Sequence, residues 1–179
     1  MRTAICDLDG TLIDSDAALV DAFLALGVDR SDISFGHVIE QECARLGISL
    51  DAYLHAYDTT ASIPFPGVEE LVTSLDRWAI CSNKHPVSGR AELTRLRWRP
   101  QLAMFADAFD GPKRLEPVLA ALGLEPEQVV FLGDTDHDRR CAMEAGVDFA
   151  LAGWNPRATP AEDDLVLDAP IELLDLLLD

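Results

Sequence analysis

Short apolar segments alternate with helical patterns along most of this sequence. The apolar segments span residues 3–6, 78–81, 102–105, 129–132, 147–151 and 165–167. The helical patterns span residues 69–75, 86–96, 115–122 and 137–145. Gly123 and Gly146 follow the last two patterns, and glycine at that position is typical of a helix end. Alternating strands and helices predict a parallel sheet with helices on both faces.

Residues 14–65 interrupt this alternation. They contain three successive segments with the i, i+3, i+4 apolar spacing of a helix face, and the first two end at Gly27 and Gly47. We expect Ser15 to cap the first helix. The fold class predicted is α/β, with residues 1–13 and 66–179 forming a Rossmann-like core. Residues 14–65 form a small all-helical cap inserted after the first strand.

The chain is strongly acidic. It has 32 Asp and Glu residues against 14 Lys and Arg residues, for a formal net charge of -18. Such a surface repels polyanions, so we expect neither a nucleic-acid partner nor binding to anionic membranes. An anionic substrate would therefore need a local positive site, either a metal ion or a placed lysine. The sequence offers two lysines, Lys84 and Lys113.

The remaining bulk features favour a cytoplasmic protein. The four cysteines are scattered without the spacing of a zinc site, which favours buried thiols in a reducing compartment. Charge interrupts the apolar residues near the N-terminus, unlike in a signal peptide, and no apolar run is long enough to cross a membrane.

Polar motifs lie at or near the ends of several predicted strands. They are Asp7-Leu8-Asp9-Gly10-Thr11, Ser82-Asn83-Lys84, Gly111-Pro112-Lys113 and Gly133-Asp134-Thr135-Asp136-His137-Asp138. Ligands bind at the carboxyl ends of the strands in sheets of this type. The motifs are therefore predicted to converge on one site.

The residue types in these motifs suit phosphoryl transfer. A carboxylate such as Asp7 can act as the nucleophile and form an aspartyl-phosphate, while Asp9 can serve as general acid and base. Asp7 and Asp134 can supply the oxygen ligands that Mg²⁺ prefers. Lys113 and Ser82 can stabilise the phosphoryl oxygens, together with backbone N–H groups of residues 9–11.

These motifs resemble those of the haloacid dehalogenase superfamily, in particular its phosphoglycolate-phosphatase-like branch. The resemblance lies in residues 4–15, 65–71, 79–84 and 132–138, the last leading to Ala145-Gly146. It implies a Rossmann-like core with a helical cap, and Mg²⁺ as the cofactor. This sequence departs from the family's pattern after Lys113, which is followed by Arg114-Leu115-Glu116-Pro117 rather than by Pro-x-Pro. Lys84 is the rival lysine, but it lies in the second motif, so we assign the charge-neutralising role to Lys113.

The resemblance implies a role for each matching residue. The catalytic residues are Asp7, Asp9 and Lys113. The phosphate-binding residues are Thr11, Ser82, Asn83 and Lys113. The metal ligands are Asp7, Asp9 through its backbone carbonyl, Asp134 and Asp138.

Together these features predict a Mg²⁺-dependent phosphatase that acts on a small phosphorylated metabolite through an aspartyl-phosphate. Phosphoglycolate is the candidate by analogy. Asp9 argues against a dehalogenase, which needs no leaving-group acid, and the absence of lysine from residues 14–65 argues against a phosphonatase. A phosphosugar mutase with the same core residues and a non-catalytic binding module of the same fold stay open as alternatives.

Overall fold

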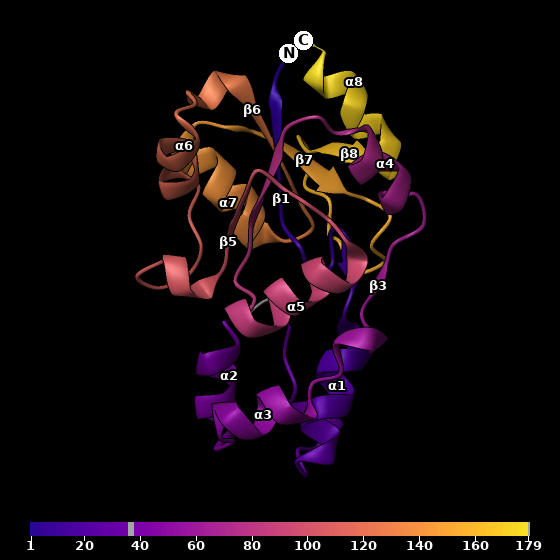
Figure 1. The fold of residues 1–179 in the computed structure, drawn as a ribbon, viewed down its shortest axis with the longest axis vertical. Helices are drawn as coiled ribbons and strands as arrows, with labels where there is room; N and C mark the ends of the chain where they lie inside the picture. Colours follow the sequence, from indigo (N-terminus) through magenta and orange to yellow (C-terminus); the bar gives the residue numbers. More distant parts are fainter. Residues whose placement is uncertain (36–37, 179) are drawn as a thin grey trace.

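A computed structural model describes residues 1–35 and 38–178, and its centre is a parallel sheet. In these residues the sheet has six strands in the order β5-β4-β1-β6-β7-β8 (Figure 1). The strands are β1 (Thr3–Cys6), β4 (Trp78–Cys81), β5 (Leu102–Met104), β6 (Val129–Gly133), β7 (Asp148–Ala152) and β8 (Leu165–Leu167). The predicted α/β fold class is confirmed, and each predicted strand is present with small shifts at its ends.

Helices cover both faces of the sheet. Ala4 and Cys6 of β1 share one hydrophobic core with α4 (Val68–Ser74), α5 (Pro86–Leu96) and α8 (Leu173–Leu177). Ile5 points to the other face and packs with α6 (Glu116–Leu122) and α7 (Asp136–Ala145). A strand that is buried on both faces needs apolar side chains at every position, which explains the unbroken apolar runs in the sequence.

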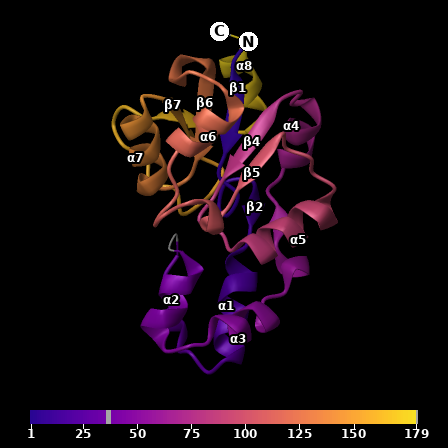
Figure 2. The same cartoon turned by 60° about the vertical axis from the view of Figure 1, so that its left-hand side comes forward.

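The predicted insertion is a helical bundle with its own core. It contains α1 (Asp16–Ala25), α2 (Ile39–Leu46) and α3 (Leu50–Ala56). The rings of Phe23 and Tyr53 pack at its centre, with centroids 4.8 Å apart. The bundle lies at the end of the molecule opposite the two termini, beyond the carboxyl ends of the central strands (Figures 1 and 2).

A two-stranded ribbon that the sequence did not predict joins the bundle to the core. Strand β2 (Ile13–Asp14) pairs antiparallel with β3 (Ile63–Pro64), so the chain enters and leaves the bundle side by side. Short 3-10 helices complete the described elements: η1 (Arg30–Asp32), η2 (Thr59–Ala61), η3 (Ala106–Ala108), η4 (Pro126–Gln128) and η5 (Pro170–Glu172).

The bundle differs from the sequence expectation at two places. The expected capping of α1 by Ser15 is wrong, because the Ser15 side chain makes no cap hydrogen bond and instead donates to Asp9. The apolar pattern of the second helix begins at Phe35 in the sequence, whereas α2 begins at Ile39. Residues 36–37, which include His37, lie outside the described residues.

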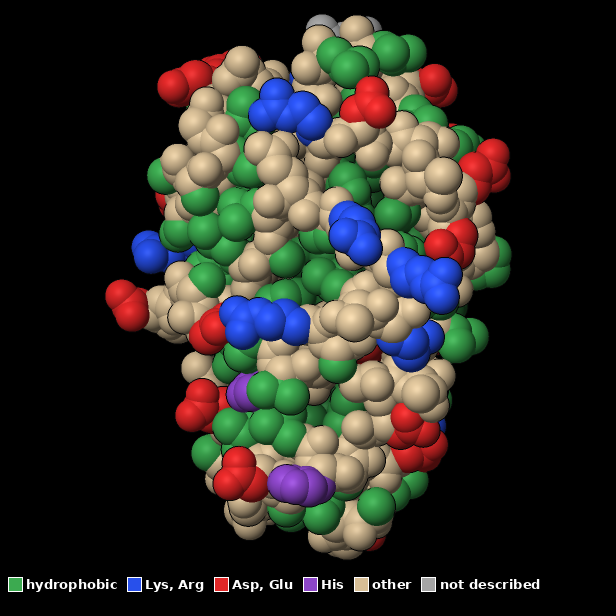
Figure 3. All heavy atoms as spheres, viewed as in Figure 1, with side chains coloured by type: hydrophobic (Ala, Val, Ile, Leu, Met, Phe, Trp, Pro, Cys, Tyr) green, Lys and Arg blue, Asp and Glu red, His purple; other side chains and the backbone are tan. Residues whose placement is uncertain are grey.

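The distribution of charged side chains and the burial of the cysteines match what the composition predicts. Acidic side chains are spread over the face shown in Figure 3, with basic side chains among them. Within the described part of the chain, Cys6, Cys43, Cys81 and Cys141 are free and buried, as expected. None of the described helices has both the length and the apolar character needed to cross a bilayer.

We predict that Leu132→Ala lowers the free energy of unfolding by about 2–5 kcal/mol, because it leaves a cavity in the fully buried β6 strand. Denaturant unfolding followed by circular dichroism measures the change. Leu178→Ala is the matched control, since Leu178 is 71% exposed. Equal effects of the two substitutions would contradict the assignment of β6 to the core.

Candidate active site

The polar motifs converge on a cavity of about 310 Å³ between the sheet and the helical bundle. The core contributes Asp7, Asp9, Ser82, Asn83, Lys84, Lys113 and Asp134 to its lining. The bundle contributes an apolar wall made of Leu19, Phe35, Ile39, Tyr53 and Tyr57. Two of the predicted site residues, Thr11 and Asp138, lie behind this lining and contact it through hydrogen bonds and ion pairs.

Asp7 lies at the end of β1 beside Lys113. The Lys113 ammonium is 2.8 Å from Asp7 Oδ1 and 2.6 Å from Asp138 Oδ1, and all three side chains are buried. The Lys113 backbone N–H donates to Asn83 Oδ1 at 2.7 Å, which fixes the loop that carries the lysine. Burial raises the pKa of Asp7 to about 6, although Lys113 opposes this shift. The nucleophile candidate is thus paired with the lysine that the sequence analysis chose.

Asp134 follows β6 and faces Asp7 across the site. Its Oδ1 accepts a hydrogen bond of 2.9 Å from the Thr11 hydroxyl, and its Oδ2 accepts one of 2.8 Å from Asn155. Burial, together with the charges of Asp7 and Asp138, raises the pKa of Asp134 to about 7. The Thr11 hydroxyl, predicted to bind phosphate, therefore orients a carboxylate in this structure.

Asp138 joins the acidic loop to Lys113. Its Oδ2 accepts hydrogen bonds from the backbone N–H groups of Asp134 and Thr135 and from the Thr135 hydroxyl. Its Oδ1 pairs with Lys113. Because Lys113 and the Thr135 donors outweigh the effect of burial, the pKa of Asp138 is lowered. Asp138 therefore fixes both the turn that carries Asp134 and the ammonium beside Asp7.

Two glycines permit the close approach of these loops. Gly10 has φ +79, and a Cβ at this position would lie 2.4 Å from Asp134 Oδ2. A Cβ on Gly133 would lie 2.4 Å from the Cβ of Asp138. Both substitutions would push apart carboxylates that the site holds together, which explains glycine at these positions.

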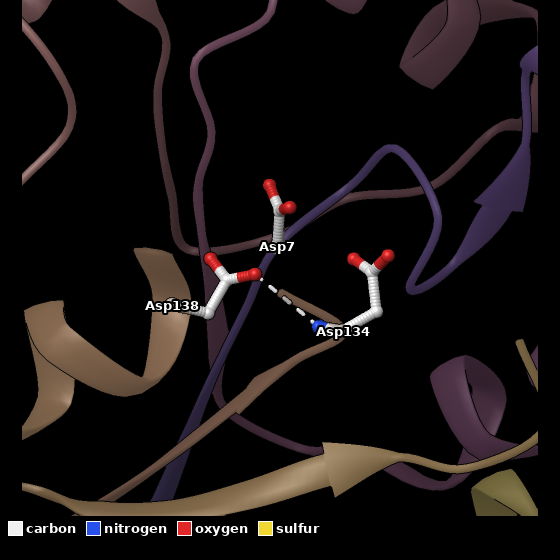
Figure 4. Close-up of side chains that lie close together, drawn as sticks. All are labelled: Asp7, Asp134 and Asp138. Atoms are coloured by element: carbon white, nitrogen blue, oxygen red, sulfur yellow. Dashed lines mark hydrogen bonds between the residues drawn. The ribbon is translucent and has the colours of Figure 1, made fainter. Parts of the chain in front are cut away.

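The acidic cluster suits a hard divalent cation. One oxygen from each of Asp7, Asp134 and Asp138 lies within 4.8 Å of the others, and Figure 4 shows the three carboxylates grouped around one space. The buried oxygens Asp7 Oδ1 and Asp138 Oδ1 contact Lys113 as ion pairs but form no hydrogen bond with any described group. An all-oxygen set with excess negative charge fits Mg²⁺.

Asp9 is held by a second lysine. Asp9 Oδ1 accepts hydrogen bonds of 2.6 Å from both the Ser15 hydroxyl and the Lys84 ammonium. Lys84 also contacts Glu92 of α5 at 3.0 Å and the Tyr57 hydroxyl at 2.8 Å. The two lysines of the chain are thus divided between the two aspartates, Lys113 beside Asp7 and Lys84 beside Asp9.

Ser82 lies at the end of β4 and is buried in the cavity lining. Its Oγ accepts a hydrogen bond of 3.3 Å from the Lys84 backbone N–H, which leaves the hydroxyl proton available to a ligand. Sequence reasoning assigned no role to Asn155, Glu92 or Tyr57. Asn155 lies shortly after β7, and this position near a strand end could have indicated a place in the site. The contacts of Glu92 and Tyr57 arise only from packing between α5 and the bundle.

Comparisons with known proteins agree with this geometry. The family model of haloacid dehalogenase-like hydrolases matches residues 4–152. The N-acetylmuramic acid 6-phosphate phosphatase of Pseudomonas aeruginosa is 27% identical, over 99% of this chain and 95% of that protein. A phosphoglycolate phosphatase of Xylella fastidiosa is 29% identical, over 88% of this chain and 82% of that protein.

The fold is also shared with solved structures. The crystal structure of CbbY from Rhodobacter sphaeroides in complex with phosphate matches with a TM-score of 0.74 and 20% identity. The match covers 97% of this chain and 96% of that chain. The predicted family is therefore confirmed: the chain belongs to the haloacid dehalogenase-like hydrolases and is an enzyme of that family.

Proposed function

We propose that this hydrolase is a Mg²⁺-dependent phosphatase that releases phosphate from a small phosphorylated metabolite through an aspartyl-phosphate on Asp7. The pairing of Asp7 with Lys113 in a cavity that also contains Asp9 carries this proposal. The named relatives support the class, since they include phosphatases for N-acetylmuramic acid 6-phosphate and for phosphoglycolate.

Two steps account for the hydrolysis. A carboxylate oxygen of Asp7 attacks the phosphorus while the bond to the leaving oxygen breaks, and Asp9 gives that oxygen a proton. Asp9 then takes a proton from water, whose oxygen attacks the phosphorus of the aspartyl-phosphate. This second attack breaks the bond to Asp7 and releases inorganic phosphate. The nucleophile and Asp9 return to their starting states.

The surrounding residues bind and orient the phosphoryl group. Lys113 would offset its charge beside Asp7, and Ser82 and Asn83 line the same cavity. Asp7 and Asp134 would hold Mg²⁺, with Asp138 supporting both the lysine and the Asp134 loop. When bound, the metal supplies positive charge that reduces repulsion between the carboxylates and the phosphate.

The bundle supports a cap role for residues 14–65. It closes the cavity opposite the strand ends, so a leaving group bonded to the phosphoryl group would contact Leu19, Ile39 and Tyr53. A cavity of about 310 Å³ fits a small metabolite rather than a polymer. We therefore propose that these residues select the substrate.

We expect Asp7→Asn to reduce phosphate release to the level of the metal-free protein, because the amide is a poor nucleophile. Release of p-nitrophenol from p-nitrophenyl phosphate with and without MgCl₂ measures this loss. Asp168→Asn is the control, since it makes the same change at an exposed position. Retained metal-dependent turnover in Asp7→Asn would overturn the assignment of the nucleophile.

We expect Thr11→Val to raise the MgCl₂ concentration needed for half-maximal activity by about 10–100-fold, because it removes the donor that orients Asp134. Activity titrated with MgCl₂ measures the shift. Thr73→Val, an isosteric change on the exposed side of α4, provides the control. An unchanged midpoint in Thr11→Val would argue that Asp134 is not a metal ligand.

The stabilisation of the protein by Mg²⁺ should increase as pH rises from about 5 to about 7. The raised pKa values of Asp7, about 6, and Asp134, about 7, mean that the metal-free folded state holds protons that the unfolded state has lost. As pH rises through this window, the loss of these protons lowers the free energy of unfolding of the metal-free protein. Mg²⁺ competes with the same protons for the two carboxylates. Unfolding with MgCl₂ and with EDTA at each pH measures the difference. A difference independent of pH would contradict this account.

A further inference from the structure

Lys84 forms a buried network that the proposed chemical steps do not use. Its ammonium contacts Asp9 Oδ1 at 2.6 Å, Glu92 Oε2 at 3.0 Å and the Tyr57 hydroxyl at 2.8 Å. These partners come from the loop after β1, from helix α5 and from the C-cap residue that follows α3. The network therefore joins the general acid to both the core and the bundle.

The burial of this lysine needs an explanation. An ammonium out of water costs several kcal/mol in effective desolvation, so a buried lysine persists only when it is well paired. Burial alone would lower the pKa of Lys84, but Asp9, Glu92 and Tyr57 together hold it above its ordinary value. Two carboxylates and a tyrosine hydroxyl are its partners in this structure.

The contacts of Asp9 are confined to one of its oxygens. Among the described residues, the Ser15 and Lys84 side chains both donate to Oδ1. Because Oδ1 already accepts these two hydrogen bonds, Oδ2 is the oxygen that remains to face a leaving group. The Lys84 contact thus fixes which oxygen can donate to the leaving group and how the carboxyl plane is turned.

Tyr57 connects this arrangement to the bundle. Its hydroxyl donates to Glu92 Oε1 at 2.9 Å while accepting from Lys84, and it lies 2.9 Å from the Ser62 hydroxyl. The Ser62 carbonyl in turn accepts a hydrogen bond from Arg95 of α5. A movement of the bundle away from α5 would remove Tyr57 from Lys84 and loosen the lysine's hold on Asp9. Helix α5 lies at the base of the sheet next to the bundle in both ribbon views (Figures 1 and 2).

We propose that Lys84 is a positioning residue that orients Asp9 for proton donation to the leaving oxygen, and that Tyr57 makes this orientation depend on the docked bundle. The inference rests on the proposed function. It assigns Lys84 an effect on leaving-group protonation rather than on phosphoryl binding, because its charge is already matched by Asp9 and Glu92.

Leaving-group dependence tests the proposal. The measured quantity is kcat/KM with Mg²⁺ for a series from p-nitrophenyl phosphate to simple alkyl phosphates. This ratio reports the step in which the leaving group departs and not the later hydrolysis. A nitrophenolate leaves readily without a proton, whereas an alkoxide does not. Lys84→Met should therefore lose about 10²-fold on alkyl phosphates, within the usual range for general acid catalysis, and little on p-nitrophenyl phosphate.

Two further variants protect the test against misfolding. Lys84→Met with Glu92→Gln removes the charge that the single variant would leave unpaired, and it should show the same leaving-group dependence. Tyr57→Phe removes a single hydroxyl, and it should show a smaller loss with the same preference for poor leaving groups. Circular dichroism checks that each variant is folded before kinetics are compared.

A double-substitution cycle shows whether Lys84 acts through Asp9. Adding Lys84→Met to Asp9→Asn should cost no further activity on alkyl phosphates, because the acid is already lost. Equal losses across the whole series in folded variants, no loss on any substrate, or full additivity with Asp9→Asn would each overturn the proposal. Absence of metal-dependent turnover in the unaltered protein would instead refute the proposed function itself.

Discussion

The crowding of carboxylates around one ammonium is the constraint on which the site depends. Asp7, Asp134 and Asp138 are buried within 4.8 Å of one another, and Lys113 pairs with two of them. One ammonium does not balance the charge of three carboxylates in a buried site. Burial raises the pKa values of Asp7 and Asp134, and the neighbouring carboxylates add to the shift. A divalent cation would resolve it, and the same charge would then serve to bind a phosphoryl group.

The two lysines of the chain both lie at this site. The chain has a net charge of -18 and two lysines, and both lysines are buried at the cavity. Lys113 pairs with Asp7, while Lys84 pairs with Asp9 and contacts the bundle through Tyr57. Both lysines of this acidic chain therefore lie beside aspartates of the cavity.

The sequence predicted the features that depend on local apolar patterns and on the order of the strands. Apolar runs marked the buried strands, and the polar residues after them met at one edge because parallel strands share their direction. The contacts that were missed depend on packing between distant segments. Nothing in the local sequence around Glu92 marks it as buried, yet it is fully buried against Lys84 and Tyr57. Ser15 stands where the sequence predicts a helix cap, but its hydroxyl donates a hydrogen bond to the Asp9 carboxylate instead.

Chemical trapping of the intermediate tests the central claim most directly. Single turnover with excess enzyme and Mg²⁺, stopped by acid, should leave the phosphoryl group on the peptide that contains Asp7. Borohydride reduction of the acyl phosphate, followed by mass spectrometry, identifies the modified position. The account predicts modification at Asp7 at times before phosphate release is complete. Modification at a different side chain, or turnover that accumulates no acyl phosphate under conditions where its formation outpaces its hydrolysis, would contradict it.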